Sequence, residues 1–233
     1  MPHTVTIKPK QNMRTKILLA SAAALALGLA TSNAQVYSAN VVGYVQLQLT
    51  NGFNMICNPL DLDGTGTNNT IQTTLGTQLP SGSAAYAFAN GAFVSPSALF
   101  SHGAWGGGTN AVNTALNPGG GIFLSVAGGS PVTVTFIGNV LQGSLSNAYN
   151  AGFNIISSQV PIAGTMQHQL GYAPTAGDSV YVWNALAQAY NTPSSLYSHG
   201  AWNVEPNLSI GQAVFLKSAA AGGGAWTTNF TVQ

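Results

Sequence analysis

Two histidines and two tryptophans stand at matching places in this sequence and are of types that can bind a ligand. His102 and Trp105 lie in the segment SALFSHGAW, and His199 and Trp202 lie in the segment SSLYSHGAW. Tryptophan beside hydroxyls and amides can stack on a neutral sugar, and histidine is a common metal ligand. A third interpretation is a local turn in which the glycine after each histidine relieves backbone strain. The sequence therefore offers these four residues as a candidate binding site.

Two carboxylates form a second candidate site. Asp61 and Asp63 begin the segment DLDGTGT, which places side-chain oxygens at alternate positions around glycines, as calcium-binding loops do. The segment lacks the third carboxylate and the bidentate glutamate of an EF-hand loop. The matching place later in the chain reads Pro-Ile-Ala, at residues 161–163. Calcium is thus the only cofactor that the sequence suggests, and an ordinary polar loop is the alternative.

The chain carries few groups that could catalyse a reaction. Its four carboxylates are Asp61, Asp63, Asp178 and Glu205. The two SHGAW segments belong to two similar stretches of the chain, and no carboxylate occurs at equivalent positions in both stretches. Glycoside hydrolysis requires a positioned pair of carboxylates, and no G-x-S-x-G segment marks a serine nucleophile. We therefore expect that the protein is not an enzyme.

The chain is poor in charge. Asp, Glu, Lys and Arg make up 4% of the residues, against roughly 25% in typical soluble domains. Four of the five basic residues precede residue 17, so the chain after Ala34 carries Lys217 against four carboxylates, a formal charge of −3. A surface without a basic patch does not favour nucleic acid or an anionic membrane. The expected partners are neutral: glycans, envelope components or further copies of this chain.

The first 34 residues have the pattern of a secretory signal peptide. A short basic stretch, Met13–Lys16, precedes an uncharged apolar run, Ile17–Ala30, and small side chains stand at the −3 and −1 positions before Gln35. Met13 is a candidate for the true start, because the residues before it add nothing to such a signal. No later stretch is long and apolar enough to span a membrane. We therefore expect the chain to be exported.

The organisation of the chain follows from its internal repetition. Residues 97–105 and 194–202 share seven of nine residues, which divides the exported part into units 35–137 and 138–233. Each unit contains alternating runs bounded by Gly, Pro and Asn, a GFN segment, and one short helical pattern, at 69–76 or at 164–171. These patterns predict an all-β fold of two tandem sandwich- or barrel-like repeats, each with about six short strands and one short helix.

The order of the motifs resembles a family of secreted proteins. The segments GFNMICNPL, YAF with a following hairpin, and LNPGGGIF together look like the secreted tandem β-repeat proteins of verrucomicrobial-type bacteria. The resemblance covers nearly all of the chain after the signal, and it implies an extracellular or cell-surface location in a Gram-negative bacterium. The second unit departs from these motifs at Ser158, Gln159 and Ile210. A site built on those positions would exist in the first unit only.

Two functions remain open at this point. Edge strands are normally guarded by charges against edge-to-edge pairing, and this chain has almost none to place there. The first hypothesis is therefore an exported structural or cell-surface protein that associates with itself or with the envelope. The alternative is a carbohydrate-binding module that uses Trp105 and Trp202, with His102 and His199 beside them.

Overall fold

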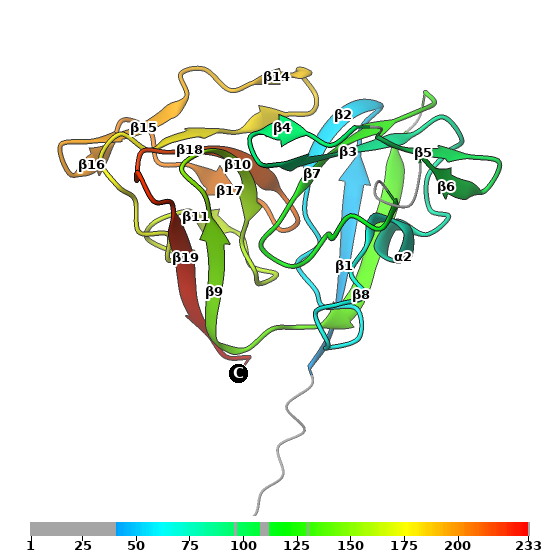
Figure 1. The fold of residues 1–233 in the computed structure, drawn as a ribbon, viewed down its shortest axis with the longest axis horizontal. Coiled ribbons are helices and arrows are strands. Elements are labelled where there is room, and N and C mark those ends of the chain that lie inside the picture. Colours follow the sequence, from blue (N-terminus) through cyan, green and yellow to red (C-terminus); the bar gives the residue numbers. More distant parts are fainter. Residues whose placement is uncertain (1–40, 96, 108–111, 130, 233) are drawn as a thin grey trace, which may run out of the picture. The chain divides into compact units, whose positions relative to one another are not determined.

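Each half of the chain folds as a β-sheet and a two-stranded ribbon that enclose a hydrophobic core (Figure 1). The described residues up to 142 are called the first half, and those from 143 onward are called the second half. The computed structural model describes residues 41–95, 97–107, 112–129 and 131–232.

The first half has one antiparallel sheet and one ribbon. Its elements are β1 (Val42–Leu49), β2 (Gly52–Ile56), α2 (Ile71–Leu75), β3 (Ala84–Ala89), β4 (Ala92–Phe93), β5 (Ala98–Ser101), β6 (Ala104–Gly106), β7 (Ile122–Val126) and β8 (Val132–Asn139). The sheet has the order β2-β7-β3-β5-β6, with β4 beside β3, and β1 pairs with β8 to form the ribbon. The ribbon is therefore a continuation of the β2–β7 pair beyond a bend.

The second half pairs its strands in the same way. Its elements are β9 (Gly143–Tyr149), β10 (Gly152–Ser157), β11 (Gly164–Thr165), β12 (Ser179–Tyr181), β13 (Trp183–Asn184), β14 (Ala189–Tyr190), β15 (Ser195–Ser198), β16 (Ala201–Trp202), β17 (Asn207–Leu208), β18 (Ala213–Ser218) and β19 (Gly224–Phe230). The sheet has the order β10-β18-β12-β15-β16, and β9 pairs with β19 to form the ribbon. Two small pairs, β11 with β17 and β13 with β14, complete this half.

The asparagine of each GFN segment holds the bend between ribbon and sheet. Asn54 Oδ1 accepts a hydrogen bond from Thr50 N at 3.0 Å, and Asn54 Nδ2 donates to Thr50 O at 2.8 Å. Asn154 makes the same two bonds with Asn150, at 2.9 and 2.8 Å. A side-chain amide that binds nearby backbone groups stabilises a turn in place of a continued ladder. The asparagine of each GFN segment therefore has a structural role, which is to hold this bend.

Alternating side chains fill the two cores. Val45 and Leu49 of β1 point into the first core, as the period-two geometry of a strand requires. Helix α2 adds Ile71 and Leu75 to the same core, and it begins at Thr70 with a capping box. The second core is built in the same way from residues that include Ile156, Tyr172, Val180, Leu216 and Trp226.

The sequence predicts a short helix at 164–171, and this prediction is wrong. Residues 166–170 form one closed turn, in which the N–H groups of Gln169 and Leu170 both donate to Thr165 O, at 3.1 and 3.0 Å. Gly171 follows with a φ of 79°, in the left-handed region that ends helices. The turn therefore closes before a second helical turn can form.

The two SHGAW segments are β-hairpins with two-residue turns. His102 and Gly103 have φ values of 51° and 79°, and His199 and Gly200 have φ values of 52° and 82°. Positive φ at both central residues defines the type I′ turn, whose twist matches that of hairpin strands. The repeated glycine is explained by this turn geometry.

The two halves join through reciprocal backbone contacts. Cys57 N donates to Gly211 O at 2.9 Å, and the equivalent Ser157 N donates to Gly119 O at 2.8 Å. A third buried cluster surrounds these bonds, and it takes residues from both halves: Met55, Cys57, Phe123, Ile155, Ala213 and Phe215. Each half thus contacts the other through equivalent positions, in an approximately twofold arrangement.

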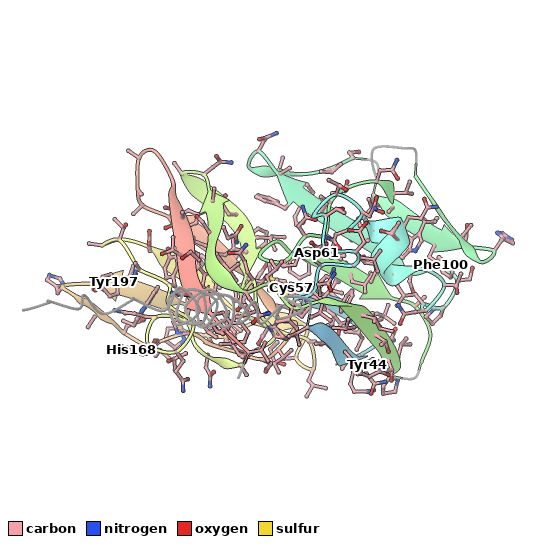
Figure 2. All side chains as sticks on the ribbon, turned by 90° about the horizontal axis from the view of Figure 1, so that it is seen from below. Tyr44, Cys57, Asp61, Phe100, His168 and Tyr197 are labelled. Atoms are coloured by element: carbon pink, nitrogen blue, oxygen red, sulfur yellow. The ribbon has the colours of Figure 1, made fainter. Side chains whose placement is uncertain are left out.

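Cys57 lies at this junction (Figure 2). Its side chain is buried, and burial raises the pKa of the thiol to about 12, against a smaller lowering by a hydrogen bond with Ser157. The thiol therefore stays protonated at neutral pH, which is the state in which a cysteine is unreactive. The role of Cys57 is to fill the junction.

The architecture confirms the predicted all-β fold class. The described residues belong to one compact unit, and the division of the chain near residue 138 stays a prediction. Within the described ranges, no helix is long and apolar enough to cross a membrane. The predicted signal peptide, residues 1–34, lies outside the described residues.

Gly121 leaves no room for a side chain at the junction of the halves. A Cβ on Gly121 would lie 2.4 Å from Ala213 Cβ and 2.8 Å from Ile155 Cγ2. We expect Gly121→Ala to lower the free energy of unfolding by about 1–3 kcal/mol, because overpacking forces the neighbours to move. Urea denaturation followed by tryptophan fluorescence measures the change. Gly129→Ala is the matched control, since a Cβ there meets nothing within 4 Å; equal losses in both variants would contradict the close junction.

Candidate functional site

A continuous layer of aromatic rings covers the faces of the two sheets that point away from the cores. In β7, for example, Leu124 is part of the first core, whereas its neighbour Phe123 belongs to the layer. Each half contributes five rings at equivalent positions, and we call the ten together the aromatic layer: Phe53, Tyr86, Phe88, Phe93 and Phe123, with Phe153, Tyr181, Trp183, Tyr190 and Phe215. One set of strands thus supplies both the cores and the layer.

Equivalent rings meet reciprocally across the junction. Phe123 and Phe215 stand at the centre of the layer with their ring centroids 6.0 Å apart. Trp183 of the second half meets Phe123 edge-on at 5.2 Å, and the equivalent Phe88 of the first half meets Phe215 edge-on at 5.0 Å. Such pairs contribute about 0.5–1.5 kcal/mol beyond the burial of their area. The rings therefore hold the two halves together and fix one another's orientation.

The rim of the aromatic layer is open to solvent. Phe53, Phe93 and Phe153 are 39%, 48% and 44% exposed. Phe53 and Phe93 border a cleft of about 370 Å³, which we call the aromatic cleft. Its described lining consists of ring side chains: Phe53, Tyr86, Phe93, Phe123, Trp183 and Tyr190. Such a lining suits an apolar or aromatic group of a partner.

A second and larger cleft adjoins the first at Trp183, which lines both. It measures about 680 Å³ and lies between the bend of β1 and β2 and the loops of the second half. Its described lining contains no charged side chain and is rich in amides and hydroxyls, among them Gln46, Gln48, Asn184, Asn191, Asn207 and Ser209. We call it the amide cleft.

The hairpin that carries Trp183 is anchored to the other half. Trp183 Nε1 donates a hydrogen bond to Phe53 O at 2.8 Å. Gln188 of the same hairpin donates from Nε2 to Phe53 O at 3.0 Å and accepts from Phe53 N at 2.7 Å. One hydrogen bond from the indole and two from Gln188 therefore hold this hairpin, with its Trp183 ring, in place between the two clefts.

The two tryptophans that the sequence singles out, Trp105 and Trp202, lie elsewhere. Trp105 packs against the first core and against Phe100, and its Nε1 donates to Gly76 O at 2.8 Å. Trp202 packs against the second core and against Tyr197, with a ring-centroid distance of 5.3 Å. Both rings are half-buried and cover the edge of a core, and neither lines the aromatic cleft or the amide cleft.

The two histidines of the SHGAW hairpins are not brought together. His102 and His199 stand exposed at hairpin tips on the outermost strands of the two sheets, β6 and β16. Phe100 and Tyr197, which belong to these hairpins, lie on opposite sides in Figure 2. Within the described part of the chain, no group of three or more His, Cys, Asp or Glu side chains could hold a metal.

The loop that carries Asp61 and Asp63 is bound by its own donors. Asp61 is buried and accepts hydrogen bonds from Gly66 N at 3.0 Å and Asn69 Nδ2 at 2.9 Å. Asp63 is exposed, and hydrogen bonds from Thr65 and then Asn68 hold the pKa of its carboxyl below the ordinary value. The carboxylates that could form a calcium site thus stabilise the loop itself.

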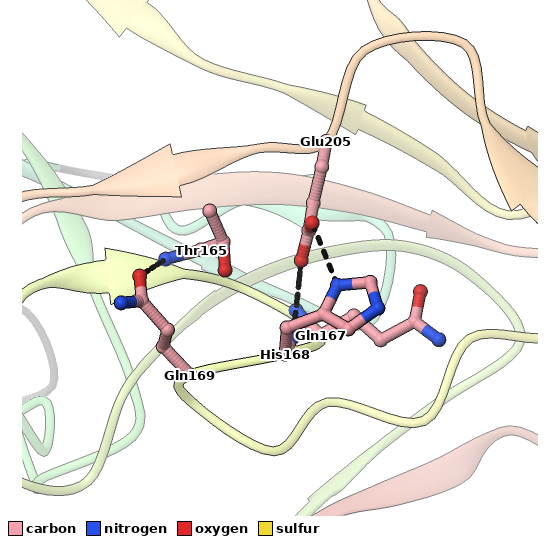
Figure 3. A network of polar contacts seen from close by, with 5 residues as sticks. All are labelled: Thr165, Gln167, His168, Gln169 and Glu205. Atoms are coloured by element: carbon pink, nitrogen blue, oxygen red, sulfur yellow. Dashed lines mark hydrogen bonds and ion pairs between the residues drawn. The ribbon is translucent and has the colours of Figure 1, made fainter.

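The described residues contain one ion pair, between His168 and Glu205 (Figure 3). Nδ1 of His168 lies 2.8 Å from Glu205 Oε2, and the backbone N–H groups of Gln167 and His168 both donate to Glu205 Oε1 at 3.0 Å. Burial raises the pKa of Glu205, but the hydrogen bonds and charge of this loop outweigh it and hold the pKa below the ordinary value. Glu205 therefore fastens the 166–170 turn to the segment before β17.

Asp178 is the remaining carboxylate, and it also supports the fold. It is fully buried and accepts hydrogen bonds from Tyr172 Oη at 2.7 Å, Thr175 N at 2.8 Å and Ala219 N at 2.8 Å. Burial and the bond to Asp178 raise the pKa of Tyr172. The polar pair stabilises the second core.

Sequence reasoning missed the aromatic layer and the amide cleft. A signal for the layer is present, because aromatic residues recur at five equivalent positions in strands whose opposite face is already apolar. The amide cleft has no such signal, since its walls come from segments more than 100 residues apart, as Leu49 and Trp183 show.

No family model, no curated protein and no solved structure matches this chain. The resemblance to the secreted β-repeat proteins therefore stays a prediction. The candidate site is defined by the geometry of the chain alone.

The packing of the two hairpin tryptophans predicts unequal costs for equivalent substitutions. Trp105→Phe removes a hydrogen bond to Gly76 O and should lower the free energy of unfolding by about 1 kcal/mol more than Trp202→Phe. Trp202 Nε1 is buried without a partner in the described structure, so its removal relieves an unsatisfied donor. Chemical denaturation of both variants tests this order. A larger loss for Trp202→Phe would show that the hydrogen bond does not decide the difference.

Glu205 predicts a dependence of stability on pH. Its folded-state pKa is lowered, so its contribution is present above the unfolded pKa and is lost as pH falls through the folded pKa. We expect Glu205→Gln to be less stable than the wild type at pH 7 and to converge with it in acid. Thermal unfolding across the acid range measures the difference. A constant gap between the two proteins from neutral pH to strong acid would contradict this assignment.

Proposed function

We propose that this chain is an exported, non-enzymatic structural or cell-surface protein that associates with further copies of itself through the aromatic layer. The observation that carries the proposal is the exposed rim of the layer, where Phe53, Phe93 and Phe153 stand partly open on one continuous apolar surface. Contiguous exposed apolar surface marks sites of association.

A second copy of the chain is the partner that this surface fits. Rings of the two halves already pack on one another with centroid distances from 5.0 Å, for Phe88 and Phe215, to 6.4 Å, for Phe123 and Tyr190. The surface is therefore complementary to rings of its own kind. An isologous contact between two copies needs this property, because the same patch faces itself.

Charge offers little opposition to such a contact. Lys217 Nζ lies 5.7 Å from the centre of the Phe153 ring, and Lys217 is the one Lys or Arg among the described residues. The carboxylates Asp61, Asp63, Asp178 and Glu205 each accept hydrogen bonds from their own neighbourhood. Because the chain after Ala34 has only these five charged side chains, repulsion between two approaching layers is weak.

Export and the lack of catalysis rest on separate support. The pattern of residues 1–34 supports export. The structural hydrogen bonds of the four carboxylates support a non-enzymatic role, since a general acid or base must be free to contact a substrate. Association with the envelope is a second form of the same proposal, in which the aromatic layer contacts an apolar surface component.

We expect sedimentation velocity to show a mass that rises with concentration. The association should persist or strengthen in high salt, because apolar contacts are not screened. The double variant Phe93→Ser and Phe153→Ser should raise the dissociation constant about tenfold or more, since it removes exposed ring area from the contact.

The control removes apolar side chains that are even more exposed, from another surface. Val42→Ser with Ile137→Ser alters the β1–β8 ribbon, where these side chains are 69% and 55% exposed, and should leave association unchanged. A monomer at every concentration would sink the proposal. Dissociation by the ribbon variant, with none by the phenylalanine variant, would move the contact away from the aromatic layer.

A further inference from the structure

We infer that the amide cleft binds a neutral glycan, with Trp183 as the ring on which a sugar stacks. The cleft is distinct from the exposed rim of the aromatic layer, so this inference does not depend on self-association. It also differs from the sequence hypothesis, because Trp105 and Trp202 do not line this cleft.

The amides of the cleft are held with donors available to a ligand. Asn184 Oδ1 accepts hydrogen bonds from Leu186 N and Ala187 N at 3.1 Å, so its orientation is fixed with Nδ2 as the remaining donor. Gln212 Oε1 accepts from Ser209 N at 3.0 Å, which fixes that amide in the same way. A pre-oriented donor loses less freedom when it binds a ligand.

Two further amides supply both donors and acceptors. The side chains of Asn191 and Asn207 line the cleft, are exposed, and make no hydrogen bond within the described ranges. Each amide offers two N–H donors and a carbonyl acceptor. Sugar hydroxyls donate and accept as well, so amides of this kind match neighbouring hydroxyl groups.

Trp183 provides the apolar part of the site. It is half-buried, and the bond from Nε1 to Phe53 O and the edge contacts with Phe123 and Tyr190 hold its ring rigidly. A rigid indole beside hydrogen-bonding groups presents an apolar face and a polar surround, which is what a sugar ring requires.

The charge and size of the cleft indicate a neutral ligand. Its described lining has no Lys, Arg or His to bind phosphate, sulfate or carboxylate groups. Its volume of about 680 Å³ falls within the range of about 300–1,000 Å³ that is typical of ligand sites. Neutral sugars are the ligand class that combines many hydroxyls with no charge.

An equivalent cleft lies between the bend of β9 and β10 and loops of the first half, and it is smaller and has a different lining. That cleft measures about 250 Å³ and is lined by Asn90, Asn147, Asn150 and Asn154, but it has Phe88 in place of Trp183, Ala89 in place of Asn184 and Gly120 in place of Gln212. The first half pairs its strands as the second half does. The amides of Asn184 and Gln212 and the indole of Trp183 are therefore not required by the fold.

Affinity electrophoresis of the full protein in gels containing neutral polysaccharides tests the inference. The probes are laminarin, hydroxyethylcellulose, xylan, galactomannan, starch and dextran, with alginate as the charged comparison. We expect retardation by at least one neutral polysaccharide and none by alginate. The double variant Asn191→Ala and Asn207→Ala should weaken binding about tenfold or more, through the loss of several hydrogen bonds.

The control variant is Gln72→Ala with Asn229→Ala, which removes exposed amides outside the cleft and should bind as the wild type does. Circular dichroism confirms that both double variants are folded. The variant Phe93→Ser with Phe153→Ser should still bind, which separates glycan binding from self-association. The inference fails if no neutral polysaccharide retards the wild type, if alginate alone does, or if the cleft variant binds unchanged.

Discussion

Two backbone hydrogen bonds set the geometry on which the other features depend. Cys57 N binds Gly211 O and Ser157 N binds Gly119 O, so the end of one sheet is fixed against a loop of the other half. Buried backbone groups must be paired, and here each half supplies the partner that the other lacks. The approach is close because Gly121 carries no side chain where Ala213 of the opposite half arrives. The aromatic layer and the amide cleft both exist only because the halves meet in this way.

Much of the fold follows from local patterns. Alternation predicts the strands around Val45 and Leu49, and a cap followed by an apolar pair predicts α2. The same kind of pattern fails at 164–171, where the N–H groups of Gln169 and Leu170 both donate to Thr165 O and Gly171 ends the turn. The turn is also bound from 37 residues away, because the carboxylate of Glu205 accepts from the backbone N–H of His168. Local propensity cannot include such a contact, and the separation of each sheet from its ribbon also depends on pairing between distant strands.

The candidate site was less accessible to sequence reasoning. The SHGAW segments attract attention because they are nearly identical, yet their identity reflects the two-residue turn at His102 and Gly103 and the packing of Trp105 on a core. Trp183 stands in a less exact repeat, YVW, which has YAF with Phe88 as its counterpart in the first half, and its partner Phe53 lies 130 residues away. Strict repetition within one chain thus indicates shared scaffold. It does not indicate which residues form a ligand-binding site.

The two proposed surfaces depend in opposite ways on the similarity between the two halves of the chain. The aromatic layer needs both halves alike, because equivalent rings such as Phe123 and Phe215 must meet across an approximately twofold junction. The amide cleft needs the halves to differ, and the differences gather there: β3 and β4 are joined by two residues, whereas β13 and β14 are joined by four, including Gln188, which anchors the hairpin to Phe53. Once two equal halves secure the fold, one copy is free to vary in the loops that the junction exposes. The surface proposed for self-association and the cleft proposed for glycan binding therefore use different residues, apart from the shared wall at Trp183.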